Sequence, residues 1–221
     1  MNVNTGVPGM GRKSQNKPQK YYSNGRVKRG PAPFAPLKKA SYRKALPELR
    51  RDFDDRCAYC MRHIGTETEM HIDHFDPRKK KSKRQEYANL FLADAHCNCA
   101  KGDAWPTPEE SDAGCRFLNC CDEYDYGTVI FEEPITHELI GVTPAAIYHI
   151  ETIDLNDPGL IEERKSRAEI LGKLEYLKEI AKHDPDMHEA VDKLFDEAKG
   201  LIPDIPPPHR YWTMLDHPDS I

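Results

Sequence analysis

One stretch of the chain, residues 57–102, contains an adjacent acid and histidine, several cysteines and an asparagine. Asp73 and His74 are adjacent, Cys57 and Cys60 lie just upstream in a Cys-x-x-Cys pattern, and the run Cys-Asn-Cys-Ala-Lys-Gly follows at residues 97–102. Few structural motifs need this combination of a carboxylate, an imidazole, thiols and an amide. The sequence therefore predicts a metal-assisted hydrolytic site in this stretch.

These residue types suit hydrolysis of a phosphodiester, which needs a deprotonated water and positive charge on the phosphate oxygens. A histidine imidazole changes protonation near neutral pH, so His74 is the candidate general base. Asp73 offers a carboxylate to Mg²⁺ if the strand bends at its end, and Asn98 offers an amide oxygen to the same cation. Lys101, one turn later, is placed to meet a phosphate. Asn89 is expected to hydrogen-bond the loop backbone or the imidazole and to hold it in position.

Charge is distributed unevenly along the chain, which has a net charge of −5. Residues 1–51 contain thirteen Lys or Arg and one acid, Glu48, for a net +12, and the remainder carries −17. One basic run stands alone in the acidic part, and it comprises Arg78, Lys79, Lys80, Lys81, Lys83 and Arg84. A polyanion would be drawn to both basic regions, so the run is predicted to bind nucleic acid beside the proposed base.

Hydropathy and composition predict four regions: a flexible basic arm over 1–40, a catalytic domain over 41–150, a helical extension over 151–202 and a Pro-rich tail over 203–221. No run is long and apolar enough to span a membrane, and the first twenty residues lack the apolar core of a secretory signal. Seven cysteines, an odd number, fit metal ligation in a reducing compartment better than disulfides. We therefore expect a cytoplasmic protein without membrane contact.

Periodicity predicts the elements around the motif. An amphipathic helix over 41–55 precedes a strand over 69–75, a second short segment over 87–92 and a helix over 98–104. Further on, two β segments, 127–131 and 137–142, suggest a supporting hairpin, and helices are expected after the Asn-Asp-Pro turn at 156–158 and over 187–198. The predicted fold class is α+β.

The order Cys-x-x-Cys, Asp-His-Phe-x-Pro, Asn-Leu and Cys-Asn-x-x-Lys-Gly over residues 57–106 resembles the HNH endonucleases, which have the ββα-metal (His-Me finger) fold. It looks closest to the HNH nucleases of bacterial anti-phage systems such as Septu and certain retrons, and residues 152–164 resemble a later segment of that group. By this resemblance Asp73 and Asn98 are ligands of a catalytic Mg²⁺ or Mn²⁺, His74 is the general base and Asn89 is the central asparagine. The flanking helices, the hairpin and the C-terminal helical segment would surround this nuclease core.

The resemblance also implies a structural zinc site with one departure. Similar proteins usually carry a second Cys-x-x-Cys, whose first position is Asp94 here. Three thiols remain in register, those of Cys57, Cys60 and Cys97. The fourth ligand could be Asp94, or His96 or Cys99 after a small backbone change, because carboxylates and imidazoles also bind zinc.

The main hypothesis is therefore a metal-dependent HNH endonuclease that cuts DNA with low sequence specificity, since no groove-reading module is present. By resemblance it would act as the effector of an anti-phage system with an ATPase partner. Two alternatives stay open: an HNH nuclease directed at RNA or tRNA, and a non-catalytic zinc-containing adaptor for nucleic acid or an ATPase.

Overall fold

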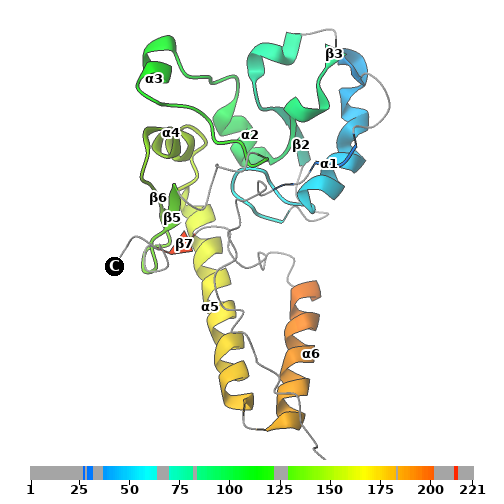
Figure 1. Ribbon diagram of the computed structural model, residues 1–221, viewed down its shortest axis with the longest axis vertical. Helices are drawn as coiled ribbons and strands as arrows, with labels where there is room; N and C mark the ends of the chain where they lie inside the picture. The colour runs from blue at the N-terminus through cyan, green and yellow to red at the C-terminus, as the bar shows by residue number, and fades with distance from the viewer. Residues whose placement is uncertain are drawn as a thin grey trace, which may run out of the picture.

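The structure is a computed structural model that describes residues 27, 29–31, 37–63, 70–81, 84–121, 129–182, 184–201 and 212–213. In the described parts, helices surround small and mainly antiparallel sheets, so the predicted α+β class is confirmed (Figure 1). The expected basic arm up to residue 26, Lys83 and most of the Pro-rich tail lie outside the described residues.

A strand pair and the helix after it form the centre of the first half. Strand β2 (Met70–His74) pairs antiparallel with β4 (Leu90–Asp94), in a register that sets Asp73 opposite Phe91 and His74 opposite Leu90. All five residues of β4 are buried, and helix α2 (Ala95–Lys101) contacts both strands. Helix α2 starts earlier than predicted because the carboxylate of Asp94 accepts a hydrogen bond from the N–H of His96 and caps it.

The loop between the strands contains the basic run. It contains the 3₁₀ helices η2 (Pro77–Lys81) and η3 (Tyr87–Asn89) and the short strand β3 (Arg84–Gln85). Strand β3 pairs antiparallel with β1 (Leu37–Lys38). The loop begins directly after β2, and the pairing of β3 with β1 attaches it to residues 37–38.

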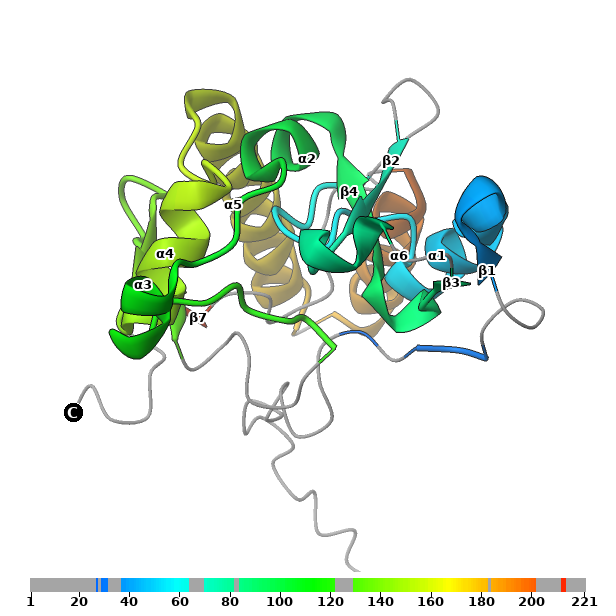
Figure 2. The ribbon, with the colours of Figure 1, turned by 90° about the horizontal axis from the view of Figure 1, so that it is seen from above.

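The predicted helix over 41–55 is present as two pieces, the 3₁₀ helix η1 (Lys39–Ala45) and helix α1 (Leu46–Phe53). Ala45, Leu49 and Phe53 are buried, and α1 packs against β4, so the apolar spacing marks the core-facing side as predicted. Helix α1 ends at Asp54, which adopts a left-handed conformation with φ of 53°. Figure 2 shows α1 on one side of the strand pair and α4 on the other.

Some residues of the expected flexible arm lie against the domain. The N–H of Gly30 donates to Asp52 Oδ2 at 3.0 Å, and the guanidinium of Arg29 lies 4.3 Å from the centre of the Tyr87 ring and 5.1 Å from that of Phe53. These cation–π contacts and the β1–β3 pairing attach residues 29–31 and 37–38 to the rest of the domain.

The segment after α2 contains two helices that periodicity did not reveal, α3 (Pro108–Asp112) and α4 (Pro144–Thr152). Each begins with a threonine cap and a proline at its first position. The predicted hairpin is present as β5 (Ile130–Glu132) and β6 (Leu139–Gly141). Gly141 packs so closely on α4 that a Cβ atom there would lie 2.6 Å from the backbone nitrogen of Ile147.

Helices α5 (Pro158–Ala181) and α6 (Pro185–Leu201) form a hairpin that projects from the rest of the structure (Figure 1). Strand β7 (Trp212–Thr213), in the expected irregular tail, pairs in parallel with β5. Among the described helices, none is long and apolar enough to cross a membrane. Large apolar side chains remain exposed on the hairpin, namely Tyr176, Leu177, Ile180, Met187 and Leu194.

Arg164 connects α5 to the hairpin of strands. Its buried guanidinium donates to the carbonyl of His137 at 2.6 Å, to the carbonyl of Leu155 at 3.0 Å and to Asn156 Oδ1 at 3.1 Å. Asn156 in turn exchanges two hydrogen bonds with the backbone of Leu139. These residues of the 152–164 segment therefore have a structural role.

Replacing Arg164 with Met should lower the free energy of unfolding by about 2–4 kcal/mol, because one buried and two part-buried acceptors lose their donor. Urea unfolding followed by circular dichroism measures the change. The matched control is Lys165→Met on the same helix. The half-exposed side chain of Lys165 pairs with Glu162 at 3.8 Å, and its loss should cost less than about 1 kcal/mol. Equal losses for the two variants would contradict the bridging role.

Candidate functional site

The end of β2 and helix α2 enclose a pocket of about 340 Å³. Its lining includes three of the four predicted catalytic residues, Asp73, His74 and Asn98. The chain bends at residues 75–76 immediately after β2, which was the condition for the adjacent acid and histidine to serve one site. The other lining residues are Tyr42, Ile72, Lys80, Gly102 and Asp103.

The carboxylate of Asp73 is buried and held by two side chains. Lys101 Nζ lies 2.9 Å from Oδ2 and 3.2 Å from Oδ1, and the hydroxyl of Tyr59 donates to Oδ2. Lys101 also donates to the carbonyl oxygen of His74 at 3.2 Å. The carboxylate of Asp73 has about four lone-pair positions. The two contacts from Lys101 and the one from Tyr59 occupy part of them and leave Oδ1 with room for a further ligand.

Lys101 was expected to meet a phosphate, and the structure places it elsewhere. Its side chain has no exposed area, and its ammonium lies 5.3 Å from the centre of the Phe117 ring in addition to its contacts with Asp73. A buried ammonium needs a buried partner, and the carboxylate one strand away supplies it.

Asn98 is oriented by a residue that the sequence analysis did not assign to the site. Its amide nitrogen lies 2.9 Å from His71 Nδ1, so the amide donates to the imidazole and its oxygen remains for a cation. His71 lies two residues before Asp73 on β2, and the alternation of strand side chains is the signal that could have placed it near the site.

His74 is buried at the rim of the pocket, and its ring packs edge-on against Tyr42 with centroids 5.0 Å apart. Asn89 does not line the pocket. Its side-chain oxygen accepts from the N–H of Asp76 at 2.8 Å and its amide donates to the carbonyl of Asp76 at 3.1 Å. Asn89 therefore holds the loop that follows His74. Of the two contacts expected from the sequence, with the loop backbone or with the imidazole, this is the contact with the backbone.

The pocket fits a hard divalent cation by its donor chemistry. A carboxylate oxygen from Asp73 and an amide oxygen from Asn98 are the ligand types that Mg²⁺ or Mn²⁺ prefers, with water and phosphate filling the other positions. Tyr59, which holds the carboxylate, was not found from sequence because only the tertiary fold brings it to β2.

The basic loop is exposed but partly paired. Arg78 donates to both oxygens of Asp76 and lies 4.4 Å from the centre of the Trp105 ring, and its guanidinium lowers the pKa of Asp76. Lys79 pairs with Glu86 at 3.2 Å, and Lys80 with Asp103 at 3.0 Å. Lys81 is exposed, and the side chains of Lys83 and Arg84 lie outside the described residues.

A second group of potential metal ligands lies next to β4. The sulfur atoms of Cys57, Cys60 and Cys97 all lie within 4.8 Å of one another and are buried. The loop that carries the first two is joined to β4 by a hydrogen bond of 2.8 Å from the N–H of Ala58 to the carbonyl of Leu92. Three clustered thiols suit Zn²⁺, which binds sulfur ligands and which the sequence also indicated.

Hydrogen bonds among the three thiols favour the deprotonated form of Cys57. Burial raises the pKa of Cys57, but hydrogen bonds from Cys60, Cys97 and the backbone of Asp94 and Tyr59 outweigh it and place this pKa well below its ordinary value. The contact with Cys57 raises the pKa of the two other thiols. Deprotonated sulfur is the form that binds a metal.

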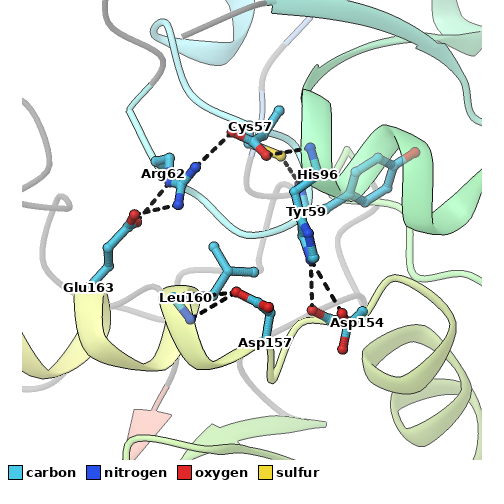
Figure 3. Close-up of polar contacts among 10 residues, drawn as sticks. Cys57, Tyr59, Arg62, His96, Asp154, Asp157, Leu160 and Glu163 are labelled. Carbon is cyan, nitrogen blue, oxygen red and sulfur yellow. Dashed lines mark hydrogen bonds and ion pairs between the residues drawn. The ribbon is translucent and has the colours of Figure 1, made fainter.

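None of the three candidates for a fourth zinc ligand joins this cluster of described ligand atoms. The carboxylate of Asp94 caps α2 and accepts from Arg62 at 3.0 Å, and Arg62 continues to Glu163 of α5 (Figure 3). His96 Nε2 lies 3.2 Å from the carbonyl oxygen of Asp154 instead. Cys99 is exposed.

The family model of the HNH endonuclease matches residues 57–104, which include the cysteine cluster and every predicted catalytic residue. Neither a curated protein nor a solved structure matches the chain. An HNH domain suggests a hydrolase that cuts nucleic acid with the help of a divalent metal.

Purified protein should contain about one zinc per chain, and Cys97→Ser should remove most of it, because two thiols hold zinc poorly. The melting temperature should fall by about 10 °C, since a structural zinc contributes several kcal/mol. Elemental analysis and thermal unfolding measure the two effects. Cys99→Ser, the same change at the exposed neighbouring cysteine, should retain the metal; equal zinc contents in the two variants would contradict the assignment.

Proposed function

We propose that the chain is a metal-dependent HNH endonuclease in which β2, β4 and α2 form the ββα-metal core. The observation that carries the proposal is the pocket lined jointly by Asp73, His74 and Asn98, two of which come from the end of a strand and one from the following helix. The match of residues 57–104 to the HNH family supports it independently.

In this proposal each residue has a separate role. The imidazole of His74 accepts the proton of the attacking water. Asp73 and Asn98 hold a Mg²⁺ or Mn²⁺ ion, which when bound supplies positive charge to the phosphate oxygens. Asn89 keeps the loop backbone after His74 in place, and His71 orients the amide of Asn98.

DNA is the proposed substrate, and the exposed lysines beside the pocket support binding of a phosphate backbone. Lys79, Lys80 and Lys81 are on η2, directly after the site. Their partners Glu86 and Asp103 are exposed, so the pairs are weak and can exchange for phosphates. Low sequence specificity stays a prediction from the sequence.

The anti-phage role and the ATPase partner stay predictions from the resemblance of the sequence. The exposed apolar side chains on the projecting α5–α6 hairpin support a protein partner of some kind, because they have a solvent-facing position that a second protein could cover. Cleavage of RNA or tRNA by the same residues is the second candidate activity, and the non-catalytic adaptor is the third function.

The deciding experiment compares wild type and His74→Ala on supercoiled plasmid, linear duplex and total RNA, with Mg²⁺ or with EDTA. We expect metal-dependent nicking by wild type and a loss of at least about 100-fold without the base. The substrate that is cut identifies DNA or RNA. Cleavage by His74→Ala at the wild-type rate would contradict the site, and a lack of cleavage of every substrate would favour the adaptor.

The choice of residue in this experiment follows from the structure. Asp73→Ala would leave the buried ammonium of Lys101 without its partner and should destabilise the fold by about 3–5 kcal/mol, so lost activity would not report on chemistry alone. His188→Ala is the matched control, because the ring of this half-exposed histidine of α6 pairs with Asp192 at 3.2 Å and lies outside the pocket.

A further inference from the structure

We infer that Lys101 keeps the affinity of the pocket for a divalent cation low until a nucleic-acid phosphate binds, so that cation and substrate bind cooperatively. The inference rests on the proposed function and concerns the regulation of the same site. It is carried by the ion pair between Lys101 and Asp73 and by the balance of charge around the pocket.

The first step is the position of the ammonium. Lys101 Nζ contacts both oxygens of Asp73, at 2.9 and 3.2 Å, and has no exposed area. The pair is buried between α2 and β2, where water and salt screen the charge much less than at the surface. A cation that binds Asp73 therefore lies close to a weakly screened positive charge.

The second step is the total charge of the described pocket. Lys101 balances Asp73, and the only other charged side chains that line the described pocket, Lys80 and Asp103, pair with each other at 3.0 Å. The affinity of a protein for a divalent cation rises with the number of uncompensated carboxylates. By itself the pocket offers a neutralised carboxylate and a neutral amide from Asn98, which make a weak site.

The third step is what nucleic acid adds. A phosphodiester brings a negative charge and oxygen ligands to the same place, and Mg²⁺ is commonly held by one or two carboxylates together with substrate phosphates. Linkage then requires that the cation strengthens binding of nucleic acid by the same factor. The enzyme would hold its cation firmly only when substrate is present.

The test measures Mn²⁺ binding by electron paramagnetic resonance to zinc-loaded protein. Every variant carries His74→Ala, so that nucleic acid is not consumed, and each is measured alone, with a short DNA duplex and with a short RNA hairpin. Without nucleic acid, Lys101→Met should bind Mn²⁺ at least about tenfold more tightly than its parent, because a nearby weakly screened charge is removed. The duplex should tighten Mn²⁺ binding to the parent by about tenfold or more.

The matched control is Lys80→Met, which removes the same charge from an exposed pocket lysine and should change Mn²⁺ affinity less than about threefold in the absence of nucleic acid. A folded Lys101→Met variant with the parent's affinity would overturn the inference. If Lys101→Met does not fold, the test rests on its parent, the His74→Ala protein. A Mn²⁺ affinity of this parent that changes with neither the DNA duplex nor the RNA hairpin would also overturn the inference.

A double variant separates this inference from the proposed function. Asp73→Asn/Lys101→Met has no charge at the pair and should lose the tight Mn²⁺ site of Lys101→Met. If it binds Mn²⁺ as tightly as Lys101→Met, the cation does not use Asp73, and both the inference and the proposed ligand set are wrong. If Asp73 is a ligand and plasmid cleavage depends on His74 and metal, but Lys101→Met leaves affinity unchanged, only the inference fails.

Discussion

The antiparallel pairing of β2 with β4 is the contact on which the rest of the structure depends. Strand β4 is buried along its whole length, with α1 and the cysteine loop packed against it. Because a shift of one residue would turn every side chain of β2 to the other face, the buried apolar residues of β4 determine the register. That register places Asp73 and His74 at the end of β2, and the chain leaving β4 enters α2 and brings Asn98 and Lys101 to the same place.

A buried ion pair at such a position has two effects. It joins the last residue of α2 to β2, so the helix that supplies Asn98 cannot move independently of the strand that supplies Asp73 and His74. It also neutralises the candidate metal ligand. Stability of the fold and electrostatics of the pocket therefore depend on the same two side chains, and experiments on either have to separate folding from chemistry.

Arg62, two residues after Cys60, connects the start of α2 to helix α5. Asp94, the residue before α2, uses one oxygen to cap the helix and the other to bind Arg62, which continues to Glu163 on α5 (Figure 3). A residue that looks like a substituted zinc ligand in the sequence thus has a mechanical role. The thiols of Cys57, Cys60 and Cys97 are left to bind a metal without it.

The sequence by itself predicted most of the elements and the residue types of the candidate site. Local spacing of apolar residues identified β2, the core face of α1, the strand hairpin and the long helices, because these patterns depend on near neighbours. The adjacent acid and histidine and the cysteine–asparagine run pointed to the HNH family, which the match of residues 57–104 supports. The helices α3 and α4 are too short to show a clear apolar period, although a threonine cap and a proline mark the start of each and Thr107 and Glu110 form a capping box.

Only the tertiary structure decided which polar groups face each other. Lys101 and Asp73 are 28 residues apart, and Tyr59 and Asp73 are 14 apart, so no local pattern joins them. The sequence suggested a phosphate-binding lysine and a zinc-binding aspartate, whereas the fold buries the lysine against a carboxylate and gives Asp94 to a helix cap and an arginine. The physical reason is that a charge removed from water takes the partner that packing brings to it, and packing is set by the whole chain.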